Sequence, residues 1–228
     1  MPNQVFKKYG KVNLSHFTVR EIKYAKSRLR LLHSLIKELK NKPASEIKIK
    51  DLCKKAEISE PSFYNYFPQK DDIFFYFVGL WSIELFLYSQ KSKSGLDSIY
   101  QFFSYTGKTS ELHPYLMKEL LAYQARADIL SRSKFVQPVT DAEKTITFGS
   151  VDGIEKISGD GLRTLIFQSL KKAVDDGELP RATNLDEVSM AVGGIFFGVA
   201  GLCASLNFKN LSTHYKNSLE IIFNGLAK

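Results

Sequence analysis

The chain has 228 residues, of which 44% are hydrophobic and 13% aromatic, and its formal net charge is +8. This length fits one large domain or two small ones around a real core. No signal peptide precedes the basic N-terminus, and the most apolar run (residues 73–88) carries Glu84 and is short for a membrane span. We therefore expect a cytoplasmic protein that does not span a membrane, with Cys53 and Cys203 as buried thiols rather than a disulfide or a redox switch.

The positive charge is concentrated at the N-terminal end. Residues 1–68 hold 15 Lys and Arg against 6 Asp and Glu, whereas residues 69–228 hold 17 against 18. A basic head on a neutral body indicates that the head meets a polyanion, and the alternative is a basic surface that is only solvated. Residues 1–22 form a basic, weakly periodic arm, which either lacks fixed structure or follows a DNA backbone.

The first predicted helix spans residues 24–40. Its apolar side chains share one face, at Leu31, Leu32, Leu35, Ile36 and Leu39. The sequence Lys-Pro-Ala-Ser at residues 42–45 ends this helix. We expect the next two helices to pack under the stripe and complete a three-helix head.

Residues 47–73 read as two short helices, a tight turn between them, and the start of a long third helix. One face of the first helix is formed by Ile49, Leu52, Cys53 and Ala56. Glu57 and Ile58 make the turn. Ser59 is a good N-cap, Pro61 suits a first turn, and Pro68 ends the second helix at Phe67.

The outer faces of these two helices are cationic and polar. They carry Lys48, Lys50, Lys54 and Lys55 on the first helix and Glu60, Ser62, Tyr64 and Asn65 on the second. Lysines neutralise phosphates, while short polar side chains on a second helix suit base edges in a DNA groove. The alternative is two amphipathic helices whose polar sides face only water.

This stretch resembles the helix-turn-helix of the tetracycline-repressor (TetR) family of bacterial transcription regulators. The family pattern is a small-residue helix, a turn, and a recognition helix that ends in Tyr-x-x-Phe and is followed shortly by Lys. This chain has Tyr64-Asn65-Tyr66-Phe67 and then Lys70. The chain departs from the pattern at Glu57, where the family usually has Gly. Glu57 is expected either to bear a positive φ or to use another turn geometry.

The resemblance implies a role for each exposed residue of the motif. The positions that face bases are those of Lys50, Glu60, Pro61 and Asn65. The positions that face phosphates are those of Lys48, Ser62, Tyr64, Tyr66 and Lys70. Ser59 belongs to the same predicted interface, and Tyr66 has the alternative of packing inward beside Phe63.

The remaining chain also reads as helices. We predict them at residues 69–90, 96–105, 114–131, 160–176, 185–206 and 211–226, with a loop and one or two helical turns over 132–158. No strand pattern of useful length and no repeat is present. The helix at 69–90 is apolar nearly all round, which indicates burial on most sides. Since it begins at the head and runs into the second half, it is the expected mechanical link between the two.

No catalytic, cofactor or metal motif is present. The four histidines (His16, His33, His113 and His214) are isolated from one another and from the cysteines. Neither a phosphate-binding glycine loop nor a nucleophile elbow occurs. The sequence therefore makes no case for an enzyme.

The second half is rich in aromatic residues, which favours a ligand pocket between helices. The predicted pocket residues are Phe77, Trp81, Tyr100, Phe103, Tyr123, Phe148 and Phe167. The alternative is that these rings simply fill the core. The resemblance implies a helical C-terminal domain that binds an effector and thereby releases DNA.

The last two predicted helices indicate an interface. Glycine costs about 0.5–1 kcal/mol in a helix interior, so several in one helix need a reason. Three of them share one face, and the predicted interface residues are Gly194, Gly198, Gly201, Leu219 and Ile222. Tight packing within one chain is the alternative to a homodimer in which two helices of each protomer form a four-helix interface.

These observations predict an all-α protein with a basic arm (1–22), a helix-turn-helix DNA-binding domain (23–68) and a helical effector-binding and dimerisation domain (69–228). The expected function is a homodimeric, ligand-responsive repressor released from a palindromic operator by a small apolar or aromatic effector. The alternative is a small-molecule binding protein whose head no longer binds operator DNA.

Overall fold

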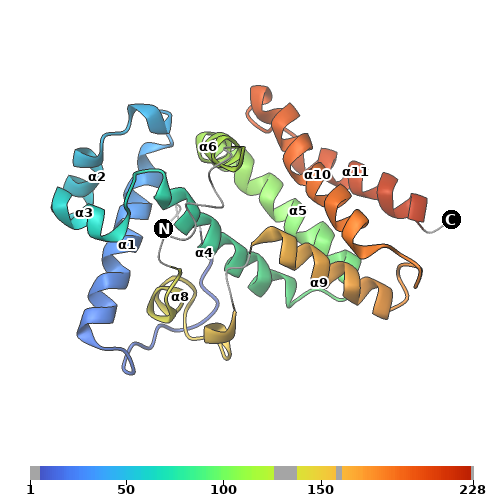
Figure 1. Cartoon of the computed structure of the whole chain (residues 1–228), viewed down its shortest axis with the longest axis horizontal. Coiled ribbons are helices and arrows are strands. Elements are labelled where there is room, and N and C mark those ends of the chain that lie inside the picture. Colours follow the sequence, from blue (N-terminus) through green and yellow to red (C-terminus); the bar gives the residue numbers. More distant parts are fainter. Residues whose placement is uncertain (1–5, 126–137, 158–160, 227–228) are drawn as a thin grey trace. The chain divides into compact units, whose positions relative to one another are not determined.

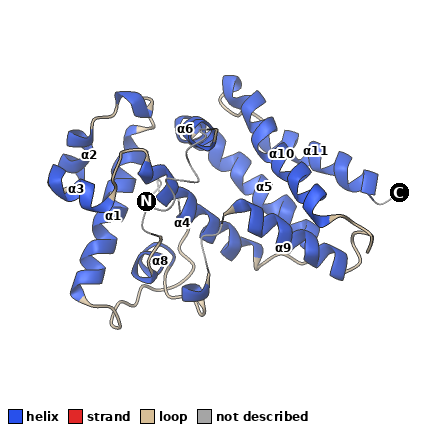
Figure 2. Ribbon diagram, in the orientation of Figure 1, coloured by secondary structure: helices blue, strands red, loops and turns tan. Residues whose placement is uncertain are grey.

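The computed structural model describes residues 6–125, 138–157 and 161–226, which contain ten α-helices and no strand (Figures 1 and 2). The predicted all-α class is therefore confirmed. The chain divides into two compact units, Met1–Glu84 with Tyr115–Gly159, and Leu85–Pro114 with Asp160–Lys228. This division groups residues 115–159 with the N-terminal head. The functional division into a DNA-binding and an effector-binding domain stays a prediction.

The first unit is built on α1 (Val19–Glu38), which packs against α2 and α8. Its other elements are a 3-10 turn (Ala44–Glu46), α2 (Ile49–Ala56), α3 (Glu60–Tyr66), the greater part of α4 (Asp72–Ser89), α6 (Pro114–Gln124), α8 (Asp141–Phe148) and a 3-10 turn at Ile154–Lys156. Helix α1 begins earlier than predicted because Thr18 and Glu21 form a capping box that satisfies its first amides.

A strap of residues 6–13 lies against the end of α8. The amides of Tyr9 and Gly10 donate to the carbonyl of Phe148 at 2.7 and 3.2 Å, and the amide of Ser150 donates to Lys11 at 2.8 Å. Phe6 is buried, with its ring centroid 5.4 Å from that of Phe77. This part of the predicted arm therefore belongs to the core of the first unit rather than extending from it.

The second unit packs α5 (Gly95–Leu112) against both α9 (Leu162–Asp175) and α11 (Leu211–Leu226). Helix α10 (Leu185–Cys203) contacts α9 and α11 and ends in a 3-10 turn at Ala204–Leu206. Helices α5 and α9 approach closely at Gly95, where a Cβ atom would lie 2.3 Å from the carbonyl oxygen of Ser169. A glycine is therefore required at that crossing.

Helices α4 and α10 are each long and apolar enough to cross a membrane by length and composition. Of the apolar stretch in α4, 67% is buried, as is typical of the core helix of a globular protein. Of the apolar stretch within Leu185–Leu206, only 33% is buried, so α10 keeps an apolar face exposed.

Candidate functional site

Helix α2 presents a cationic surface over a small apolar anchor. Leu52, Cys53 and Ala56 are buried, and α2 packs against α1. The side chains of Lys48, Lys50, Lys54 and Lys55 are exposed. The predicted inner and outer faces of this helix are therefore those of the structure.

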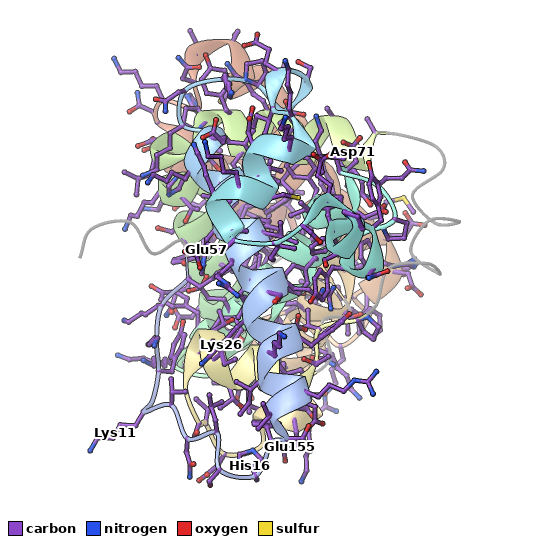
Figure 3. All side chains as sticks on the ribbon, turned by 90° about the vertical axis from the view of Figure 1, so that its left-hand side faces the viewer. Lys11, His16, Lys26, Glu57, Asp71 and Glu155 are labelled. Carbon is purple, nitrogen blue, oxygen red and sulfur yellow. The ribbon has the colours of Figure 1, made fainter. Side chains whose placement is uncertain are left out.

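The turn between α2 and α3 is built on a left-handed residue. Glu57 has φ 55° and ψ 47°, and the amide of Ile58 donates to the carbonyl of Cys53 at 3.0 Å. A left-handed residue followed by a bond back to the last helical turn is the usual way to end a helix with a glycine. Of the two expectations for Glu57, the structure has the first: the residue bears the positive φ. Figure 3 shows Glu57 on the surface of the head.

Helix α3 is capped, anchored and exposed as predicted. The hydroxyl of Ser59 accepts from the amide of Ser62 at 3.3 Å, and Pro61 lies in the first turn. Phe63 and the C-cap residue Phe67 are fully buried. The opposite face exposes Glu60, Pro61, Tyr64 and Asn65. Helix α3 therefore offers a carboxylate, an amide and a phenol to solvent from a rigid base.

Three predicted phosphate contacts already have partners within the chain. The hydroxyls of Ser62 and Ser59 lie 2.8 Å apart, and the Tyr66 ring lies 5.3 Å from that of Tyr24 on α1. The ammonium of Lys70 donates to the carbonyls of Ala44 at 2.5 Å and Ile47 at 2.9 Å. Lys70 thus fixes the segment that leads into α2, and its contact with DNA stays a prediction.

The structure adds two groups that sequence reasoning missed. Glu119 on α6 accepts from the amide of Ala44 at 2.8 Å, beside the carbonyl that Lys70 holds. Arg28 on α1 and Glu143 on α8 form a fully buried ion pair with a separation of 3.3 Å. Burial raises the pKa of Glu143, and the neighbouring Arg28 opposes that rise. The Thr140-x-x-Glu143 capping box was a local signal for α8, but nothing local pointed to its partner.

The predicted ligand-binding residues are divided between the two units, and their grouping in one pocket stays a prediction. Phe77, Trp81, Tyr123 and Phe148 are buried in the first unit, where Phe77 and Trp81 stack at 6.5 Å. Tyr100, Phe103 and Phe167 belong to the second unit, and the Phe167 side chain is exposed. For the four residues in the first unit, the alternative that the rings fill a core accounts for their burial.

A groove of about 560 Å³ lies in the second unit, along α5 and α11, and Tyr100 and Phe103 line it. Phe103 and Leu219 are buried, whereas Tyr88 and Tyr100 are half-buried. Polar side chains complete the lining, at Gln101, Ser104, Ser212, Thr213, Lys216 and Asn217. This mixture of rings, amides, hydroxyls and one ammonium suits a small amphipathic molecule.

The predicted interface residues divide between surface and core. At Gly194, Gly198 and Gly201 an added Cβ atom would meet nothing within 4 Å. These glycines therefore do not serve close packing inside the chain. Leu219 is fully buried in its own protomer, so its side chain has no surface to offer a partner, and Ile222 is half-buried.

Exposed apolar side chains flank the α10 glycines. Met190 and Leu202 on α10 are 73% and 81% exposed, and Ile221 on α11 is 76% exposed. No charged residue occurs between Glu187 and Lys209.

Among the described residues, no group of three or more His, Cys, Asp or Glu is placed to hold a metal ion.

Comparisons with known proteins agree with the helix-turn-helix geometry. Residues 31–77 match the family model described as bacterial regulatory proteins, tetR family. A search of curated protein sequences found no match.

Solved structures extend the likeness beyond the head. Thermus thermophilus FadR, a TetR family transcriptional repressor in complex with lauroyl-CoA, is similar at 16% identity and a TM-score of 0.62, over 87% of this chain and 94% of that one. A TetR transcriptional regulator from Rhodococcus sp. RHA1 is similar at 16% identity and a TM-score of 0.56, over 86% and 97%. The family model thus matches the helix-turn-helix of this chain, and the two solved structures show that the chain shares their helical fold.

Proposed function

We propose that the protein is a homodimeric repressor that leaves a palindromic operator when a small aromatic effector binds. The observation that carries this proposal is the recognition helix. It has a buried aromatic base, a regular N-cap and an exposed polar face, next to the exposed lysines of α2. The left-handed Glu57 closes α2 with a regular turn, which supports a head that presents α3 to DNA.

Base reading by α3 is tested with DNA of random sequence. Selection of randomised duplexes by the full chain should yield a two-fold symmetric site. Glu60 stands in the first turn, where its carboxylate is favoured by the helix N-terminus and suited to a cytosine amino group. Glu60→Gln should relax preference at one base pair per half-site, by roughly 1–3 kcal/mol. A variant with unchanged selectivity would leave Glu60 with a capping role only.

The exposed face of α10 supports a second copy of the chain as partner. An uncharged helix face with open space over its glycines fits another such helix at short distance. Apolar faces of this kind are typical of the central part of homodimer interfaces. A dimer also supplies the two heads that a palindromic operator requires.

The groove along α5 and α11 is our candidate effector site. The ligand-bound FadR repressor supports effector-responsive repression for a chain of this fold. The rings of Tyr88 and Tyr100, with Lys216 at the rim, favour a small aromatic molecule that carries an acidic or polar group. Calorimetry with such compounds should give binding that Tyr100→Ala weakens. Phe167→Ala, a matched ring deletion outside the groove, should not; equal losses in both variants would remove the groove as the site.

Helix α4 is the proposed route from effector to DNA. It begins in the first unit and ends in the second, so it is the continuous element available for coupling. Trp81, the one tryptophan of the chain, is buried in the first unit and does not line the groove. A coupled effector should change its fluorescence and weaken operator binding by about 5–150-fold. Compounds that bind the groove without altering operator affinity would contradict the coupling.

A further inference from the structure

Helix α8 is buried on nearly every side, although it has few large apolar residues. Six of its eight residues are buried: Ala142, Glu143, Lys144, Thr145, Thr147 and Phe148. It packs against α1, beside which Figure 1 shows it nearly end-on, and the strap of residues 6–13 holds its C-terminal end. An isolated helix of this length is not stable in water, so its docking to α1 maintains it.

The docking is centred on Arg28. Its side chain is fully buried, and its Nη1 atom lies 3.3 Å from the Glu143 carboxylate and 3.2 Å from the carbonyl of Pro138. The residues of one short segment therefore supply both the charge and a carbonyl acceptor for this guanidinium. A buried guanidinium that loses its carboxylate is strongly unfavourable, so the place of Arg28 depends on Glu143.

Arg28 also contacts the base of the recognition helix. Its guanidinium carbon lies 4.1 Å from the Tyr76 ring centroid and 5.2 Å from that of Phe67, the C-cap residue of α3. It lies 5.5 Å from the ring of Tyr24, which in turn contacts the ring of Tyr66. Phe67 thus contacts the Arg28 guanidinium directly, and Tyr66 contacts it through the ring of Tyr24. Glu143 on α8 neutralises this cation.

We propose that Glu143 is a positioning residue for DNA recognition. Through Arg28, it holds the C-terminal end of α3 in the orientation that presents Glu60, Tyr64 and Asn65. Operator binding then requires residues 138–148 to be docked on α1, and any event that displaces this segment weakens DNA binding. The proposal rests on operator binding by the head and adds a second segment on which that binding depends.

The test compares Glu143→Gln with Glu155→Gln, which removes an exposed carboxylate from the same part of the chain. The first readout is hydrogen exchange of the amides of residues 63–67 without DNA. We expect faster exchange there in Glu143→Gln and no change in Glu155→Gln. Because this readout needs no operator, it distinguishes failure of the positioning from failure of the proposed repressor function.

The second readout is affinity for the duplex that the wild-type chain selects. Glu143→Gln should weaken this binding about tenfold with an unchanged salt dependence, since no phosphate-binding cation is lost. A purely stabilising ion pair would lower the melting temperature but leave the exchange of residues 63–67 and the affinity of the folded protein at wild-type values. That result would overturn the proposal.

A milder pair of variants covers the case in which Glu143→Gln does not fold. Thr140 and Thr18 cap α8 and α1 with the same capping-box geometry, and both residues are exposed. Thr140→Val should loosen α8 and weaken operator binding several-fold, because the Thr140 hydroxyl contacts the Glu143 carboxylate. Thr18→Val removes an equivalent cap at the N-terminus of α1, ten residues before Arg28, and should leave affinity within about twofold. Equal effects of the two substitutions would contradict a specific role for α8.

Discussion

Glu57 shows how a single residue fits a motif whose usual residue it replaces. The turn requires a left-handed backbone, which costs a non-glycine residue roughly 1–2 kcal/mol. The Glu57 carboxylate lies 3.2 Å from Nη1 of Arg30, but this exposed ion pair offsets little of that cost. The strain is local, and the buried Phe63 and Phe67 anchor α3 beside the turn.

Glu57→Gly should therefore stabilise the protein. We expect a gain of about 0.5–1 kcal/mol, because relief of the left-handed strain exceeds the extra chain entropy of glycine. Thermal unfolding of the apo chain measures it. Glu57→Ala is the control, since it loses the ion pair but keeps the strain and should not gain stability. A lower melting temperature for Glu57→Gly would show that the carboxylate matters more than the backbone.

Two lysines of the predicted interface should behave differently. Lys48 is exposed at the N-cap of α2, whereas Lys70 is bound to two carbonyls that precede α2. Lys48→Ala should lower the slope of log affinity against log salt by about one unit and leave stability unchanged. Lys70→Ala should destabilise the head by about 1–2 kcal/mol, because two carbonyls lose a charged donor. Salt titrations and unfolding curves of both variants test this, and a stable Lys70→Ala head would contradict the structural role.

At the scale of elements, local signals located most of the helices. The predicted helices at 69–90, 160–176 and 211–226 correspond to α4, α9 and α11, and the reading of 132–158 as a loop with one or two helical turns corresponds to α8. Part of the predicted 114–131 helix lies outside the described residues. The strap and the Arg28–Glu143 pair were beyond prediction, because residues 115 positions apart in sequence carry no local sign of their contact. Burial of Phe77, Trp81, Tyr123 and Phe148 does not decide whether they line a pocket, because apolar rings look alike in a core and in a cavity.

The α10 face gives a prediction at this scale. Gly198 has open space in its own chain, so Gly198→Leu should not disturb the protomer and should favour the helix. If a partner helix occupies that space, the leucine should yield folded monomers that lose operator binding, as measured by light scattering and gel shift. Gly198→Ala, with little added volume, should remain dimeric. A stable dimer of the leucine variant would place the interface elsewhere.

At the scale of the molecule, helix α4 begins in the first unit, which carries the helix-turn-helix, and ends in the second unit. The first unit is larger than a three-helix head, since α6, α8 and the strap contribute to it. Its proposed DNA contacts come from α2 and α3, while Glu119 binds the amide of Ala44 ahead of α2 and Glu143 pairs with Arg28 on α1. The proposed effector site and the proposed dimer face both lie in the second unit.

The most direct measurement is a gel shift with the duplex selected by the wild-type chain, combined with the mass of the retarded complex. We predict one complex with two chains per two-fold symmetric duplex, bound at least about 10³-fold more tightly than unrelated DNA at physiological salt. A duplex with a single half-site should bind far more weakly, because it engages one head of the dimer. Binding that is absent, or equal for all sequences, would contradict the account of this chain as an operator-binding regulator.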